Sequence, residues 1–490
     1  MEATFTVTSP VPLIILGIPA GIAVFGVGIA RLSRLQETFK QIEKPSLLLG
    51  TGLTLLLLIY HAPILFTGAV YEFSLLSMRL ESTNIAPSIA TALIFFLTSI
   101  YNIKAEKGGR LKPEVYNFFV LMFLICMLGL MLVYDIFAVA LFIELVIAVS
   151  VVMVLHAKGK EAVEASFKYL IITAISALFV ILGTMLIYIT TQASNIDEIL
   201  ANPGPLADSP TVVVIVAICF IAGLGADIGI APFHGWLPDA FPASKPAVNC
   251  FFAAEPIALF IALHRLIQTL YTVSPSVVLP ILVTSVGAFS LIFGASMAYA
   301  QKNFMRMVAY ATIEEFGYIM IIFGVLTPFS YAVGQLYLMN VSIMKLGILL
   351  TLGSVLISTG TMDMPSLGGL GKRMKLTSAA YLISILSLAG IAPLSGFFTK
   401  WFLFEAIYQH LLTNVGIMLA ASVVLVLMIT SLFAFVFLIR SFHTIFTGTL
   451  KDALKDVRET PKEMWIPAII TACIIIVFGL IPHLFLAFII

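Results

Sequence analysis

The chain has 490 residues, of which 61% are hydrophobic and 10% are charged, and its formal net charge is +1 at pH 7. Soluble globular domains contain about 25% charged residues, so these charges cannot cover a water-facing surface of this size. A nearly neutral chain also lacks the basic surface that binds nucleic acid. The composition therefore excludes a soluble enzyme and a nucleic-acid-binding domain, and it favours an all-α integral membrane protein.

An apolar run of about 20 residues can cross a bilayer as a helix, and the sequence contains about fourteen such runs. No basic segment precedes the first run, so we expect it to be a retained helix and not a cleaved signal. In chain order, the predicted spans are 11–32, 46–69, 84–103, 114–133, 136–156, 165–190, 211–238, 247–270, 276–300, 304–326, 329–357, 376–403, 413–440 and 464–488.

Lysine and arginine in the connections indicate the orientation of these spans. Nearly all of them lie in the connections after the odd-numbered spans, as in segments 31–44, 104–112 and 372–375. The alternate connections hold almost none, with Arg79 as the main exception, and the one near 197–208 is acidic. Because basic loops stay on the cytoplasmic side, the pattern predicts that both termini lie on the outer side of the cell membrane.

A four-residue sequence, Gly-Ile-Ala-Pro, occurs twice, in segments 229–236 and 390–397. The two copies lie in predicted spans seven and twelve, an odd number of spans apart, which indicates an inverted repeat of spans four to eight and nine to thirteen. Proline in mid-span breaks a helix, and paired broken spans mark the ion pathway of many transporters. The alternative interpretation is that both proline-containing segments are helix kinks that serve packing and have no part in an ion pathway. The predicted parts are N-terminal helices (1–110), a first half-channel (111–270), a second half-channel (271–442), and a loop with the last helix (443–490).

Ionisable residues inside the predicted spans are the candidate ion-translocation site. A charged side chain at the bilayer centre raises the free energy of insertion by at least about 2.5–3.5 kcal/mol, so the presence of each one requires an explanation. The order of carboxylate, lysine and broken helix also occurs twice along the chain. The candidates are Glu144, Lys168, Asp227, His234, Glu255, Glu314, Glu315, Lys345, Lys400 and Glu405, with His264 and Arg265 near one end of their span.

Such groups can move protons, because desolvation makes a buried lysine release its proton more easily and a nearby carboxylate opposes this effect. We expect Glu144 to interact with a neighbouring cation, for example Lys168. The alternative for any one residue is a structural ion pair, and Lys168 lies close enough to its helix end to extend to the interface. Of His264 and Arg265, at least one is expected to be interfacial.

Cofactor and metal motifs are not found in the sequence. The four cysteines, Cys126, Cys219, Cys250 and Cys473, lie in apolar surroundings without a CxxC spacing, which is typical of small core residues. We therefore expect no cofactor in this chain, and any redox chemistry to lie in other subunits.

Residues 231–240 resemble the PFHGWLPDA signature of the antiporter-like membrane subunits. That family comprises subunits of respiratory complex I, Mrp cation/proton antiporters and membrane-bound energy-converting hydrogenases. Segments 167–170, 309–318 and 368–374 are also similar, and 388–400 is the closest match. The resemblance covers at least residues 135–405 and implies a cation-translocating subunit of a multi-subunit complex, partnered by further antiporter-like subunits.

By this resemblance, Glu144 matches the family's glutamate of span five, Lys345 its lysine of span eleven and Lys400 its lysine of span twelve. Segment 313–317 is similar to hydrogenase-type members, so a hydrogenase-related complex is the favoured subgroup.

The sequence departs from the family pattern at three positions. Asp227 stands where the family usually has a lysine, Val341 where a histidine is usual, and Glu255 lies one turn from Ala258, where a lysine or histidine is expected. Because hard cations prefer oxygen ligands, Asp227 and Glu255 form a possible sodium site. The alternatives are an inactive half-channel, or pairing of Asp227 with a structural lysine such as Lys168.

Three functions remain open from the sequence: a translocating subunit for protons, sodium ions or both; a structural antiporter-like subunit with one or both half-channels inactive; and a stand-alone secondary transporter.

Overall fold

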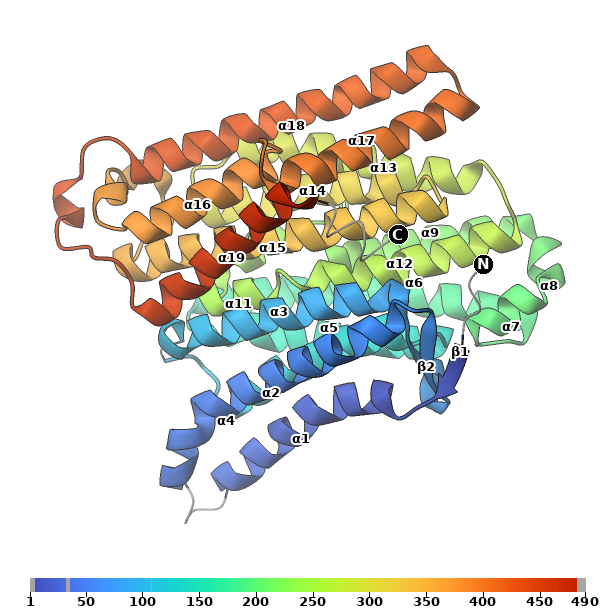
Figure 1. Cartoon of the computed structure of the whole chain (residues 1–490), viewed down its shortest axis with the longest axis horizontal. Helices are drawn as coiled ribbons and strands as arrows, with labels where there is room; N and C mark the ends of the chain where they lie inside the picture. The colour runs from blue at the N-terminus through green and yellow to red at the C-terminus, as the bar shows by residue number, and fades with distance from the viewer. Residues whose placement is uncertain (1–4, 32–35, 107, 483–490) are drawn as a thin grey trace. The chain divides into compact units, whose positions relative to one another are not determined.

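The computed structural model describes residues 5–31, 36–106 and 108–482. Its helices divide into two compact units (Figure 1). Of the described residues, the first unit comprises 5–31, 36–103, 108–228 and 254–279, and the second comprises 104–106, 229–253 and 280–482.

The first unit consists of helices and one small sheet. Its helices are α1 (Val11–Arg31), α2 (Gln36–Leu65), α3 (Ser82–Ala105), α4 (Pro113–Leu132), α5 (Ile136–Leu155), α6 (Lys160–Thr191), α7 (Ile196–Ala201), α8 (Gly204–Ala207), α9 (Pro210–Ile228) and α12 (Glu255–Val273). Helix α6 packs against α5 and α9, and α12 packs against α4 and α9. This packing brings together the helices that carry the candidate residues of this unit.

The second unit is helical among its described residues, apart from short 3₁₀ turns. Its helices are α10 (Leu237–Ala243), α11 (Pro246–Phe251), α13 (Val278–Ala300), α14 (Phe304–Phe323), α15 (Pro328–Thr359), α16 (Lys375–Leu388), α17 (Ser395–Asn414), α18 (Ile417–Phe446) and α19 (Lys462–Leu480). Helix α15 is at the centre of the unit and packs against α11, α14, α16, α17 and α19. Most of its residues are buried, as an apolar helix without a polar face requires.

The predicted all-α membrane fold is confirmed. Twelve helical segments of the described chain are long and apolar enough to cross a membrane. The other two predicted spans are also helical: span ten is α14, which carries Arg306, Glu314 and Glu315, and span twelve is divided between α16 and α17. Burial of the two glutamates inside the protein explains why α14 is less apolar than a lipid-facing helix.

Both predicted helix breaks are confirmed. Helix α9 ends at Ile228, and α16 ends at Leu388. Gly229 and Gly390 have φ angles of 87° and 80°, which favour glycine, and the following Ala231–Pro232 and Ala392–Pro393 peptide bonds are both cis. A serine donates to a freed carbonyl at each break: Ser290 to Ala231 at 3.1 Å and Ser431 to Ala389 at 3.2 Å.

A third break was not predicted. Span eight is divided into α11 and α12, and residues 252–254 form a turn between them. Pro256 stands in the first turn of α12, where the missing N–H of proline costs no helical hydrogen bond. As a result Glu255 lies at the start of a helix, where the helix dipole favours a negative charge.

The sequence also did not predict the small sheet of β1 (Phe5–Thr8), β2 (Ala69–Phe73) and β3 (Met78–Leu80). Strand β2 is parallel to β1 and antiparallel to β3. Arg79 of β3 forms ion pairs with Glu72, at 3.2 Å, and with Asp197. These acidic partners explain why one arginine lies in a connection that otherwise contains almost no basic residue.

Candidate functional site

Asp227 is the most buried candidate of the first unit. It lies in the last turn of α9 with 2% of its surface exposed, and Ser176 of α6 donates to its Oδ1 at 2.5 Å. Within the described part of the chain, its Oδ2 has no hydrogen-bond partner and the residue makes no ion pair. The alternative pairing of Asp227 with Lys168 is therefore wrong for this conformation.

Glu255 accepts a hydrogen bond from one hydroxyl group, which in turn lies beside a second hydroxyl group of the same unit. Tyr169 of α6 donates to Glu255 Oε1 at 3.2 Å, and the Tyr169 hydroxyl lies 2.8 Å from the hydroxyl of Ser150 on α5. All three side chains are buried. Asp227 also lies within electrostatic range of Glu255 and Glu144. Carboxyl and hydroxyl oxygens are ligands suited to a hard cation, but in the described part of the chain no group of three or more His, Cys, Asp or Glu side chains is placed to hold a metal ion.

Glu144 and Lys168 do not form the expected pair. Glu144 is half-buried on α5 and makes no ion pair among the described residues. Lys168 is about half exposed on α6, and its Nζ lies 2.8 Å from Glu164 Oε1, one helical turn earlier. A pair of this kind on a helix surface is typical of a structural contact, and the role of Lys168 in translocation stays a prediction.

Lys400 is the centre of the cluster in the second unit. It lies on α17 with 3% of its surface exposed. Its Nζ is 3.4 Å from Glu315 Oε1 on α14, donates to Ser431 of α18 at 3.2 Å, and lies 4.9 Å from the centre of the Tyr318 ring. Because Ser431 also donates to the carbonyl of Ala389, one hydroxyl connects the buried ammonium group to the second helix break.

Glu315 has two partners, whereas its neighbour Glu314 has no hydrogen-bond partner among the described residues. Tyr337 of α15 donates to Glu315 Oε2, and Lys400 approaches Oε1. Glu314 is 1% exposed, and both of its carboxyl oxygens lack a described hydrogen-bond donor. One ammonium group therefore lies beside two buried carboxyl groups, and it can balance only one negative charge at a time.

Lys345 is separated from this cluster by a small cavity. It is buried on α15, and its Nζ lies 5.2 Å from the centre of the Phe316 ring. The cavity measures about 10 Å³, and its walls include Lys345, Glu315 and Val341. That volume is at the lower limit for one water molecule, and the surface of the cavity is apolar.

Polar side chains around the second break form a network that the sequence did not predict. Asn340 of α15 donates to Thr399 at 3.0 Å and accepts from Ser395 at 2.7 Å. Ser387 accepts from the backbone N–H of Gly396 at 3.0 Å. These bonds join α15, α16 and α17 and satisfy polar groups that a broken helix would otherwise leave unpaired in the membrane.

The remaining candidates lie apart from the two clusters. The His234 ring packs 4.6 Å from that of Phe293 in the second unit. Glu405 is exposed on α17. Arg265 donates to the carbonyl oxygens of Val133 and Met131 at the end of α4, at 2.5 and 2.8 Å, which is a structural helix-capping role.

Broken helices and buried carboxyl, lysine and hydroxyl groups define a polytopic membrane protein of the antiporter-like class. Residues 133–430 match the family model described as NADH:quinone oxidoreductase/Mrp antiporter, transmembrane. The chain belongs to this family.

Relatives come from several branches of the family. NADH-quinone oxidoreductase subunit N of Desulforudis audaxviator is 31% identical over 323 residues, which cover 64% of this chain and 63% of that protein. The chain thus spans less than two thirds of that relative's length. A Na(+)/H(+) antiporter protein of Bacillus subtilis is 26% identical over 392 residues, which cover 80% of this chain and 78% of that protein.

Solved structures show the same fold. A chain of the Mrp complex from Dietzia sp. DQ12-45-1b matches with a TM-score of 0.84 at 21% identity, over 98% of this chain and 95% of that one.

Proposed function

We propose that this chain is a cation-translocating, antiporter-like subunit of a larger membrane complex, and that protons move through the cluster around Lys400. The observation that carries the proposal is the position of Lys400, buried between Glu315 and Ser431 and linked through Ser431 to the second helix break. Placing an ammonium group inside the membrane is unfavourable in free energy, and an ionisable residue found there usually has a function.

The proposed proton path starts at Lys345 and passes through the cavity to Glu315. From Glu315 the proton reaches Lys400 and then Ser431, next to the carbonyl of Ala389. Glu314 is the proposed proton store of this path, because only one of the two adjacent carboxyl groups can be balanced by Lys400. Each proton that arrives at or leaves Glu314 or Glu315 changes the charge beside Lys400. This change favours the next proton transfer along the path.

The carboxyl groups of the first unit support a second candidate function. Asp227 Oδ2 has no hydrogen-bond partner among the described residues, and Glu255 and the Tyr169 hydroxyl supply further oxygen atoms in the same unit. We propose that the first half-channel translocates sodium ions. The alternative is that this half-channel is inactive. The name of the Bacillus subtilis relative includes both ions.

The family and the sequence support a proposal for the membrane location and the partners of the protein. We propose that residues 111–270 and 271–442 form the two half-channels, and that the chain lies in the cell membrane with both termini on the outer side. Its partners are other membrane subunits, including further antiporter-like subunits, in a redox-driven or Mrp-type complex. The hydrogenase-related branch is favoured by segment 313–317. Electron-transfer cofactors are assigned to the other subunits.

Replacement of Lys400 by alanine tests the proposal. In membrane vesicles containing the intact complex, Lys400→Ala is expected to lower coupled proton transport by about tenfold or more, which corresponds to a rise of about 1.4 kcal/mol in the transfer barrier. Lys158→Ala, at an exposed loop position, is the control and should transport normally. Assembly is checked by the yield of purified complex. Normal proton transport in an assembled Lys400→Ala complex would exclude the proposed path.

A further inference from the structure

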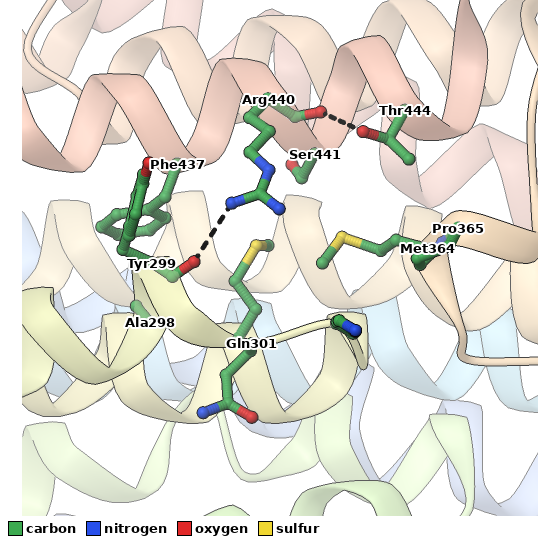
Figure 2. A pocket seen from close by; sticks show the side chains of 11 residues that line it. Ala298, Tyr299, Gln301, Met364, Pro365, Phe437, Arg440, Ser441 and Thr444 are labelled. Atoms are coloured by element: carbon green, nitrogen blue, oxygen red, sulfur yellow. Dashed lines mark hydrogen bonds between the residues drawn. The ribbon is translucent and has the colours of Figure 1, made fainter.

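A basic pocket lies in the second unit where α13 and α18 end. Its volume is about 30 Å³, and its walls include Tyr299, Lys302, Met364, Pro365 and Arg440 (Figure 2). These residues come from the end of α13, the connection to α14, the 3₁₀ turn Met364–Ser366 and α18. We refer to it as the Arg440 pocket. None of the candidate ion-translocation residues lines it.

The charge of the Arg440 pocket is positive and uncompensated. Arg440 and Lys302 are both exposed, and neither forms an ion pair with a carboxylate in the described part of the chain. Lys451, which does not line the pocket, donates to the carbonyl of Pro365. No acidic residue lines the pocket. The neighbouring carboxylate of Asp363 accepts from the N–H of Ser366 at 3.0 Å.

Arg440 contacts Tyr299 and keeps unused donors. Its Nη1 donates to the carbonyl of Tyr299 at 3.3 Å, and its guanidinium lies 5.5 Å from the centre of the Tyr299 ring (Figure 2). A guanidinium has five N–H donors, and this is its single side-chain hydrogen bond to the described residues. The other donors can bind two oxygens of a phosphate group at once.

Two apolar stripes lead to the Arg440 pocket. On α18, the exposed residues follow the helical repeat up to Arg440: Leu425, Ile429, Leu432 and Val436. On α13, the exposed residues leading to Tyr299 are Ile281, Phe289 and Ile292. The rings of Tyr299 and Phe433 lie 5.2 Å apart and join the two helices. Exposed apolar faces of this kind on membrane helices are surfaces for acyl chains, and tyrosine is common where such a face meets the headgroups.

We propose that the Arg440 pocket binds the phosphate headgroup of an anionic phospholipid, whose acyl chains lie along the stripes of α13 and α18. Cations without acidic partners match an anionic headgroup, and the adjoining apolar faces match its chains. Basic pockets between membrane helices bind such headgroups on the cytoplasmic side. The loop charges predict that the connection following span nine, which contains Lys302, is on that side.

Lipid retention by the purified complex tests this site. After exhaustive washing in a neutral detergent, phospholipids are extracted from the intact complex and quantified by mass spectrometry. The double variant Arg440→Gln/Lys302→Gln is expected to retain about one anionic phospholipid fewer per copy of the chain than the wild type. Lys372→Gln/Arg373→Gln removes two exposed cations outside the pocket and should retain the same number as the wild type. Arg440→Lys should retain most of the lipid.

A second measurement keeps the proposal testable if the double variant fails to assemble. Wild-type complex in nanodiscs should have a higher melting temperature with phosphatidylglycerol than with phosphatidylcholine, and the single variant Arg440→Gln should reduce that difference. An equal stabilisation by inorganic phosphate in phosphatidylcholine nanodiscs would indicate a soluble-anion site and overturn the proposal. Unchanged retention of anionic lipid by the double variant would also overturn the proposal. So would a cross-linking result in which Thr444→Cys reacts with another subunit and not with an added photoreactive lipid.

Discussion

The side chain of Lys400 lies directly against Gly390, because a Cβ atom added to this glycine would stand 3.2 Å from Lys400 Cδ. The glycine thus has two functions in one position. Its φ angle of 80° forms the break between α16 and α17, and its missing side chain leaves room for the lysine. The motif that breaks the helix is therefore also part of the wall of the proposed proton path.

Gly390→Ala is expected to impair both stability and transport. A residue with a Cβ loses roughly 1–2 kcal/mol in the left-handed region, and the added methyl group also displaces Lys400. Gly360→Ala is the matched control, since Gly360 has a φ angle of 71° but nothing within 4 Å of its added Cβ. Both variants should lower the melting temperature of the complex, and only Gly390→Ala should also slow proton transport. An equal effect of the two on transport would contradict this role.

The two adjacent carboxyl groups of α14 are expected to respond differently to neutralisation. Glu315→Gln removes the negative charge that pairs with Lys400 and leaves one amide oxygen to accept from either Lys400 or Tyr337, and breaking a buried pair costs about 3–5 kcal/mol. Glu314→Gln removes no hydrogen bond of the described structure and should assemble normally but transport poorly. Melting temperature and vesicle transport, measured side by side, check both outcomes. Full transport by Glu314→Gln would show that Glu314 is not the proton store.

Asp227→Asn tests the sodium proposal for the first unit. If Asp227 binds the ion, the variant should assemble and lose the dependence of transport on sodium concentration. Ser176→Ala, which removes the donor to Oδ1 but leaves Oδ2 unchanged, should keep that dependence. Intact assembly of Asp227→Asn with unchanged sodium dependence would favour an inactive half-channel.

Transport is expected to require a carboxyl side chain at the position of Glu144, and a neutral polar side chain is not expected to replace it. It is half-buried and has no ion-pair partner in the described chain, but it lies within electrostatic range of Asp227. Glu144→Gln should therefore reduce coupled transport more than Glu144→Asp, in vesicles with matched amounts of complex. Equal transport by the two variants would assign Glu144 a structural role.

The helices and two of the three breaks could be predicted because they depend on local sequence. Long apolar runs require helices in a membrane, and the Gly-Ile-Ala-Pro segments stop them. The break before Glu255 was missed because Pro256, near the middle of span eight, comes without the glycine that marks the other two. The sheet was missed because its strands are three to five residues long and carry no clear periodicity.

The candidate site could be predicted only as far as its charged residues. Charge inside an apolar run is visible in the sequence, so Asp227, Glu315 and Lys400 were found. Hydropathy does not tell which face of a helix a residue occupies, and for this reason the contact of Lys168 with Glu164 could not be predicted. The tyrosines and serines that complete the clusters, such as Ser431, could not be found, because a hydroxyl group in an apolar run resembles many others until its partner is known.

Tyr337, Asn340 and Lys345 all belong to the single unbroken helix α15, and each joins a different part of the second unit. Tyr337 contacts Glu315, Asn340 contacts the break through Thr399 and Ser395, and Lys345 lines the cavity. Because these three residues share one helix, its backbone fixes their positions relative to one another. The contacts to Glu315, to the second break and to the cavity are therefore expected to change together in any variant that shifts α15.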